Sequence, residues 1–171
     1  MVAVTPRLQL ENRLSKTTTT VTEFLEHLVG EPVDALERNH LMTKAGIPNL
    51  LGLEEGHCLL ARSTVLRGRT SGQSYLHAES LLVPSRLPPG FCDQLKTGTD
   101  PIGRILERYG IEFTRTLLPS PEPEQASVFS GVRVPDEHLY ARTYRVAIDG
   151  EPAMVISEWF LPALERFLSA C

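Results

Sequence analysis

Cysteine is scarce in this chain. Only Cys58, Cys92 and Cys171 occur among its 171 residues. Their number is odd, they lie far apart, and their spacing matches neither a metal-binding motif nor a disulfide framework. We therefore interpret them as reduced thiols of a cytoplasmic protein and expect no metal site.

Long apolar runs and blocks of positive charge are missing as well. No apolar run approaches the roughly 20 residues of a membrane-spanning helix, and the N-terminus lacks the apolar core of a secretory signal. Repeats, a glycine-rich phosphate loop and a nucleophile elbow are also absent. The net charge is -4 and the arginines are scattered among carboxylates, which argues against a nucleic-acid or anionic-membrane partner.

The composition that remains is that of an ordinary globular protein. Hydrophobic residues make up 42% of the chain and charged residues 22%, both typical values. A chain of 171 residues is long enough to form one hydrophobic core without disulfides or metals. We expect one domain over residues 17–171, preceded by an N-terminal arm over residues 1–16 with a weak helical pattern of leucines.

The clearest local signal is a β-hairpin near the end of the chain. Two runs rich in β-branched and aromatic residues, 139–148 and 151–162, are joined by Asp149 and Gly150, a pair typical of a two-residue turn. Because alternate residues of a strand share a face, Glu158 points to the more apolar face. A buried unpaired carboxylate is costly. It is therefore either a structural ion pair with an arginine on a neighbouring strand or a functional group.

A second charged residue falls among core positions, in the strand expected over residues 58–66. This segment is apolar on both faces, as a central strand is, yet it carries Arg62. A guanidinium keeps its charge, so a buried Arg62 must hold a carboxylate of the protein or of a ligand. In the returning strand, 75–83, His77 and Glu79 share a face. Histidine and glutamate can bind a metal or act as general acid and base, but we interpret this pair as solvated residues on a polar face.

The other elements are shorter and complete a mixed α+β pattern. The threonines of residues 17–20 are interpreted either as a linker or as the N-cap of a helix that Gly30 ends. We also expect a strand at 33–42, a loop or short helical flap at 43–57, helices at 91–96 and 102–109, a strand at 111–118, an extended proline-rich connector at 119–124 and a closing helix after 162.

Four stretches of the chain resemble a known family in the same order. They are Arg62-Ser63-Thr64-Val65-Leu66, Asp100-Pro101-Ile102-Gly103-Arg104-Ile105-Leu106, Ala141-Arg142-Thr143-Tyr144-Arg145 and Met154-Val155-Ile156-Ser157-Glu158-Trp159-Phe160-Leu161-Pro162. Together they are similar to the chorismate pyruvate-lyase family, and in particular to the branch whose members carry a strand of the Ala78-Glu79-Ser80-Leu81 type. The resemblance extends from about Thr17 to Pro162, which is most of the chain.

This resemblance implies a fold and a reaction. The fold is a single α+β domain, an antiparallel sheet of about six strands with flanking helices and helical flaps over a buried pocket. The reaction converts chorismate to 4-hydroxybenzoate and pyruvate without metal or organic cofactor. The product would serve ubiquinone, plastoquinone or specialised-metabolite biosynthesis, and the sequence does not choose among them. We expect a monomer.

The resemblance also implies site residues. Arg62 matches the arginine that holds the ring carboxylate, and Glu158 matches the glutamate that contacts the ring hydroxyl. Ile102 and Val21 match positions where backbone amides and flap side chains close over the ligand. Arg62 and Glu158 are also the two charged residues that strand alternation places in the core. Catalysis would then consist mainly of holding a reactive conformer of the substrate between Arg62 and Glu158 in a dry pocket.

Three further arginines fall in the same stretches, Arg104, Arg142 and Arg145. We interpret them as surface or helix-end residues, the commoner case, and assign none to catalysis. One position departs from the better-known branch of the family, in which an arginine follows a small residue and precedes Ser or Thr. This chain has Glu79 there, and its negative charge is expected to alter the electrostatics of the pocket.

Alternative functions remain open. UTRA-type ligand-sensing domains share the fold, so the pocket could bind an aromatic carboxylate as an effector instead. We expect no helix-turn-helix segment ahead of residue 17, and the pair of Arg62 and Glu158 favours a lyase over a sensor. A lyase for a related enolpyruvyl substrate and a purely structural role are the remaining alternatives.

Overall fold

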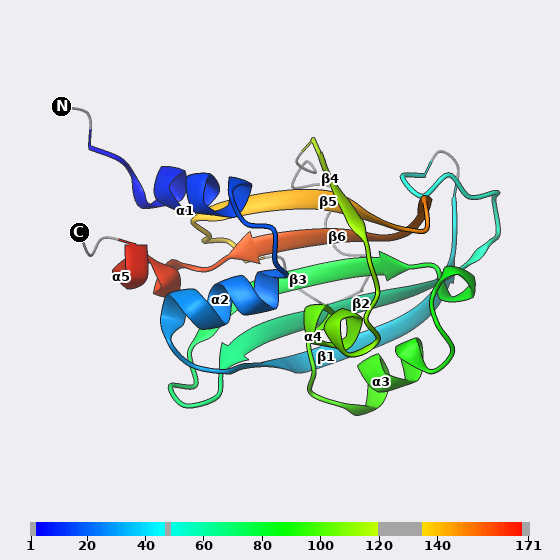
Figure 1. Cartoon of the computed structure of the whole chain (residues 1–171), viewed down its shortest axis with the longest axis horizontal. Coiled ribbons are helices and arrows are strands. Elements are labelled where there is room, and N and C mark those ends of the chain that lie inside the picture. Colours follow the sequence, from blue (N-terminus) through cyan, green and yellow to red (C-terminus); the bar gives the residue numbers. More distant parts are fainter. Residues whose placement is uncertain (1–2, 47–48, 120–134, 169–171) are drawn as a thin grey trace.

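The computed structural model describes residues 3–46, 49–119 and 135–168. Within these ranges the chain forms one antiparallel sheet and five α-helices (Figure 1). The strands are β1 Val33–Lys44, β2 Cys58–Gly68, β3 Ser74–Leu82, β4 Thr114–Leu118, β5 Tyr140–Ile148 and β6 Glu151–Phe160. The helices are α1 Pro6–Ser15, α2 Val21–Val29, α3 Phe91–Thr97, α4 Ile102–Arg108 and α5 Glu165–Leu168, with short 3-10 turns at Pro84–Arg86 and Pro162–Leu164.

The sheet has the strand order β1-β2-β3-β6-β5-β4, with every neighbouring pair antiparallel. The expected α+β fold with an antiparallel sheet is thus confirmed, and the hairpin forms β5 and β6. The strand expected from residue 111 begins only at Thr114, and β6 ends at Phe160. In the described part of 45–57 the chain is a loop rather than a helical flap. The expected connector at 119–124 lies outside the described residues except for Pro119.

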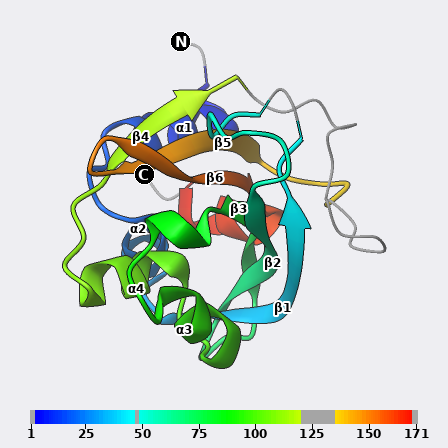
Figure 2. The ribbon, with the colours of Figure 1, turned by 90° about the vertical axis from the view of Figure 1, so that its right-hand side faces the viewer.

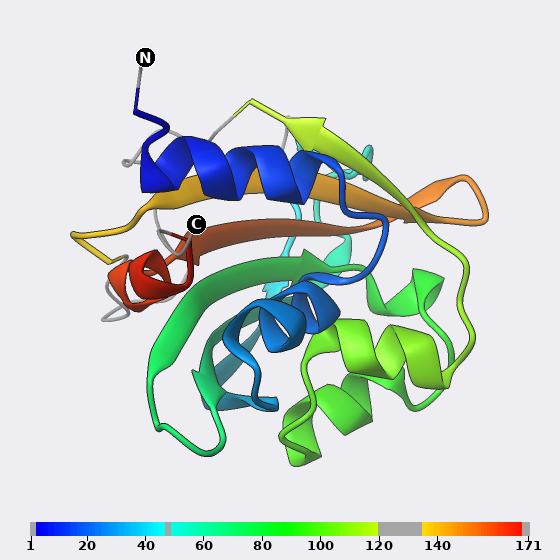
Figure 3. The ribbon, with the colours of Figure 1, turned by 60° about the vertical axis from the view of Figure 1, so that its left-hand side comes forward.

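The helices cover one face of the curved sheet. Figures 2 and 3 show α2, α3 and α4 next to one another against this face, with α1 running along β5. Two apolar clusters fill the space beneath them. One packs α3 and α4 on the middle strands and includes Phe91, Ile105 and Ile156. The other packs α1, α2 and α5 on β1, β2, β3 and β6 and includes Leu10 and Leu25.

The opposite face has its own cover. Leu51 and Leu53, from the loop that precedes β2, are buried against Leu59, Val83 and Val155. The loop expected in residues 43–57 therefore packs on the sheet through its leucines. On the helical face, α1 buries Leu10 and Leu14 in the second cluster. The boundary between the N-terminal arm and the domain after residue 16 stays a prediction.

Helix α2 begins and ends as its sequence predicts. The Thr20 hydroxyl accepts a hydrogen bond from the backbone N–H of Glu23 at 3.3 Å, which satisfies a donor that has no partner within the helix. Gly30 ends the helix in the left-handed conformation, with φ of 74°, a region that favours glycine. The capping interpretation is therefore confirmed for Thr20, and residues 17–19 connect α1 to α2 as a linker does.

Helices α2 and α4 pack closely at one point. A Cβ added to Gly103 would lie 2.7 Å from the Cβ of Thr20 and 2.9 Å from its hydroxyl oxygen. The same hydroxyl donates to Glu107 Oε1 at 3.2 Å. The helix-capping threonine of α2 thus rests directly on the glycine of α4, and only a residue without a side chain fits there.

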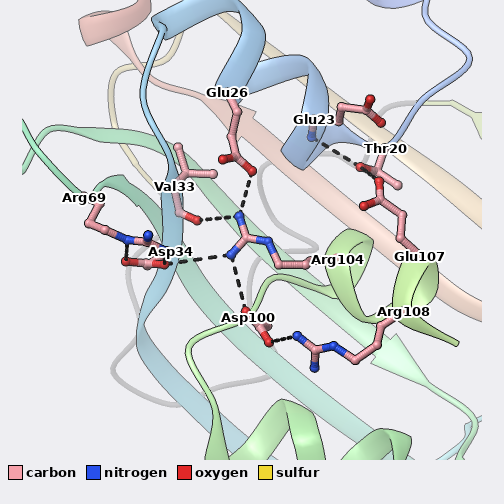
Figure 4. Close-up of polar contacts among 10 residues, drawn as sticks. All are labelled: Thr20, Glu23, Glu26, Val33, Asp34, Arg69, Asp100, Arg104, Glu107 and Arg108. Carbon is pink, nitrogen blue, oxygen red and sulfur yellow. Dashed lines mark hydrogen bonds and ion pairs between the residues drawn. The ribbon is translucent and has the colours of Figure 1, made fainter.

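An ion-pair network reinforces this contact (Figure 4). Arg104 of α4 donates to Glu26 of α2 at 2.7 Å and to Asp100 at 3.3 Å, and it lies 3.9 Å from Asp34 of β1. Asp100 also accepts from Arg108, and the hydrogen bond from Arg108, with help from Arg104, holds the pKa of Asp100 below its usual range. Arg104 is therefore a half-buried link between α2, α4 and β1, so the expectation of a surface or helix-end role misses its function.

The Gly103 contact generates a stability prediction. Gly103→Ala should lower the free energy of unfolding by about 1–3 kcal/mol, because the new methyl group forces α4 away from Thr20. Gly46→Ala is the matched control, since nothing lies within 4 Å of a Cβ at that position, and it should change stability by no more than about 0.5 kcal/mol. Urea unfolding of both variants measures the difference. Equal midpoints for the two would contradict the close packing of α2 on α4.

Candidate active site

A pocket opens between the helices and the sheet, where the two apolar clusters meet. The empty space there, its open mouth included, is about 530 Å³. Its floor comes from β2, β3, β5 and β6, and its cover from the first turns of α2 and α4. Arg115, in β4, closes one side. The lining is mostly apolar, with a few polar groups among aliphatic side chains.

Strand alternation decides which residues form the floor. Arg62 and Thr64 face it from β2, Ala78 and Ser80 from β3, and Glu158 from β6. Ser80 pairs with Arg62 and Ala78 pairs with Glu158. Because both of these β3 side chains are small, the space above them stays open between Arg62 and Glu158. Because β2 and β6 are two strand spacings apart, their backbones lie about 10 Å from each other. The two charged residues therefore stand on opposite sides of the open space.

Glu158 is held by two hydrogen bonds from β5. Arg142 Nε donates to Oε2 at 2.7 Å and the Tyr144 hydroxyl donates to Oε1 at 2.6 Å. Glu158 is 1% exposed and Arg142 is 6% exposed. The structural alternative considered for Glu158, an ion pair with an arginine on a neighbouring strand, is thus present, and the same carboxylate lines the pocket. The expectation that Arg142 is a surface residue is wrong.

Burial and the Glu158 carboxylate together set the pKa values of the two donors. Burial alone would lower the pKa of Arg142, but the Glu158 carboxylate outweighs it and the pKa is raised. Burial, reinforced by the same carboxylate, raises the pKa of Tyr144 well above its usual range. Arg142 therefore keeps its charge and Tyr144 keeps its proton, so both remain hydrogen-bond donors to Glu158.

The structure brings all four sequence-predicted site residues to one pocket. Arg62 is 2% exposed on β2 and Glu158 faces the same space from β6. Val21 opens α2 and Ile102 opens α4, and both side chains line the cover. Their contacts with a ligand stay a prediction.

His77 and Glu79 lie elsewhere. Both are on the face of β3 that points away from the pocket, with His77 Nε2 3.7 Å from Glu79 Oε1 and side chains only 7% and 12% exposed. The expectation of a solvated face is wrong, because β3 is a central strand and is covered on both sides. Ala78 and Ser80, rather than Glu79, face the pocket. Glu79 therefore does not contribute a charge to the pocket wall, contrary to expectation.

Three residues of the site were not predicted from the sequence. The sequence does not predict Arg142 and Tyr144 as neighbours of Glu158. A regular two-residue hairpin would pair Glu158 with Ala141, so that Arg142 and Tyr144 would point to the other face of the sheet. A register shift between Val146 and Ala147 moves the pairing by one residue. Arg115 has no signal in the sequence, since it stands on a polar edge strand.

The described residues contain no group of three or more His, Cys, Asp or Glu side chains arranged to hold a metal ion. None of the helices that the structure describes is long and apolar enough to cross a membrane.

The Arg142–Glu158 pair generates a second prediction. Arg142→Met leaves the carboxylate buried without its cation and should lower the free energy of unfolding by about 3–5 kcal/mol. The double variant Arg142→Met with Glu158→Gln should recover most of this loss, since the uncompensated charge is gone. Arg145→Met is the control on the opposite face of β5. A double variant as unstable as the sum of the single changes would show that the two side chains do not interact.

Comparisons with known proteins agree with this geometry. A family model described as Chorismate pyruvate-lyase Rv2949c-like matches residues 17–168. The chain is 30% identical over 118 residues to a protein from Mycobacterium tuberculosis (strain CDC 1551 / Oshkosh) named chorismate pyruvate-lyase, a match that covers 63% of this chain and 55% of that protein. The chain thus spans about half the length of that relative. A protein of the same name from Mycobacterium leprae (strain TN) is 29% identical over 161 residues, which cover 86% of this chain and 72% of the relative.

Among solved structures, PhnF from Mycobacterium smegmatis is similar in fold. The TM-score is 0.51 at 12% sequence identity, with 86% of this chain and 66% of that chain covered. At that identity the likeness concerns the fold alone. The family match covers most of the chain and includes every element of the pocket. The chain therefore belongs to the Rv2949c-like chorismate pyruvate-lyase family.

Proposed function

We propose that this protein is a chorismate pyruvate-lyase that converts chorismate to 4-hydroxybenzoate and pyruvate. The observation that carries the proposal is the placement of Arg62 and Glu158 on opposite sides of one buried, largely apolar pocket. The family match and the two mycobacterial relatives support it. A cytoplasmic monomer that needs no cofactor is part of the same proposal, and the pathway that uses the product stays open.

The polar ends of the pocket suit the polar ends of the substrate. In chorismate the ring carboxylate and the ring hydroxyl lie para to each other. A guanidinium binds a carboxylate through two parallel hydrogen bonds, so Arg62 would take the ring carboxylate. Glu158, oriented by Arg142 and Tyr144, would accept a hydrogen bond from the ring hydroxyl. The aliphatic wall between them would exclude water from the ring.

The reaction needs little more than this placement. The hydrogen on the hydroxyl-bearing carbon moves to the methylene of the enolpyruvyl group while the neighbouring ring carbon–oxygen bond breaks. The six atoms involved form a ring, the electron pairs shift around it, and the products are the aromatic acid and pyruvate. The protein would contribute by holding the enolpyruvyl arm over that hydrogen in a dry site. In the stepwise alternative, Glu158 polarises the hydroxyl or carries the proton.

The test is incubation of the purified chain with chorismate in the presence of a chelator. Chromatography should show 4-hydroxybenzoate, and a separate assay should show an equal amount of pyruvate. Arg62→Gln should lower kcat/KM by about 100-fold or more, because it removes a buried charged partner of the carboxylate. Arg145→Gln, on the opposite face of the sheet, should leave the rate unchanged.

The same assay with Glu158→Gln separates the two mechanisms. A rate close to that of the parent chain would remove the carboxylate from proton transfer and favour the concerted reaction. A loss of several hundred-fold with unchanged KM would favour the stepwise one. No product at all, with a melting temperature raised by hydroxybenzoates, would contradict the lyase and support an effector-binding role.

A further inference from the structure

Arg115 is a second cation of the pocket wall. It stands on β4, and its guanidinium lies 4.9 Å from the centre of the Tyr144 ring. One of its terminal nitrogens donates to the Thr19 carbonyl oxygen at 3.3 Å. Its Nε is buried and has no hydrogen-bond partner in the described part of the chain, and no ion pair of Arg115 occurs there either. A buried N–H group without an acceptor indicates a place where a ligand can supply one.

The one carboxylate among the described residues of the pocket wall does not pair with Arg115. Among the described residues that line the pocket, the charged ones are Arg62, Arg115 and Glu158. Glu158 is already ion-paired with Arg142 behind the wall. Arg115 therefore has no ion pair with Glu158, and a carboxylate of the ligand can take that place.

The two arginines approach from different sides. Arg62 comes from β2 and Arg115 from β4, with β3, β6 and β5 between them. Arg115 lies over the ring of Tyr144, whose hydroxyl donates to Glu158. Arg115 is therefore at the Glu158 end of the pocket, and Arg62 is at the other end.

We propose that Arg115 binds the enolpyruvyl carboxylate of chorismate, an inference that rests on the proposed function. The enolpyruvyl ether is attached to the ring carbon next to the one that bears the hydroxyl. With the hydroxyl at Glu158 and the ring carboxylate at Arg62, the second carboxylate falls at the Glu158 end, on the side of Arg115. This contact fixes the rotation of the arm, which brings its methylene toward the migrating hydrogen.

This assignment gives Arg115 a role in specificity. The product 4-hydroxybenzoate has one carboxylate, which Arg62 holds, so it makes no contact with Arg115. Arg115 therefore binds substrate and leaves the affinity for the aromatic product unchanged. Arg62 binds both.

The experiment compares substrate with product in the full chain. Arg115→Gln should raise KM for chorismate at least tenfold and lower kcat, while the Kd of 4-hydroxybenzoate, measured by calorimetry, changes less than twofold. Arg62→Gln should weaken both ligands. Arg115→Lys, which keeps the charge, should recover part of the loss, and Arg145→Gln is the matched control with parent values for both ligands.

Each other outcome counts against a defined claim. If the parent chain turns over chorismate and Arg115→Gln keeps a normal KM, the assignment of Arg115 is wrong and the lyase function stands. Equal weakening of chorismate and 4-hydroxybenzoate in both Arg115 variants would also overturn it, since Arg115 would then act on the pocket as a whole. If the parent chain binds chorismate without converting it, the lyase proposal fails. The affinities of the Arg115 variants for chorismate then still measure the contribution of Arg115 to binding. A parent chain that neither binds nor converts chorismate overturns both.

Discussion

The buried carboxylate of Glu158 is the constraint on which the site depends. A charge 1% exposed is costly unless it is paired and hydrogen-bonded, and β5 supplies both requirements through Arg142 and Tyr144. The pairing exists because the hairpin register shifts by one residue near its turn. With both carboxylate oxygens held from behind, Glu158 is presented to the pocket in a fixed orientation.

The cover of the pocket depends on a different kind of contact. Helices α2 and α4 meet where Thr20 rests on Gly103. Arg104 of α4 also pairs with Glu26 of α2 and with Asp34 of β1. Val21 and Ile102 each stand next to that contact, at the first residue of their helix. The packing that brings the helices together therefore also sets the distance between cover and floor.

Much of this could be predicted from the sequence, and the failures have physical reasons. Strand alternation is a local property, so it placed Glu158 and Arg62 on core faces, and turn chemistry found the hairpin. The position of Arg142 depends on a bulge that no local pattern reveals. The burial of His77 and Glu79 depends on which strands are central, which only tertiary structure decides. Arg115 belongs to the site because β4 pairs with β5 at the edge of the sheet, a long-range fact.

The proposed function requires that one pocket holds an aromatic acid between Arg62 and Glu158. A crystal structure of the chain with 4-hydroxybenzoate tests it most directly. We expect the carboxylate of the ligand on the Arg62 guanidinium and its hydroxyl within hydrogen-bond distance of Glu158, under Val21 and Ile102. A ligand bound in the reverse orientation, or outside this pocket, would contradict it.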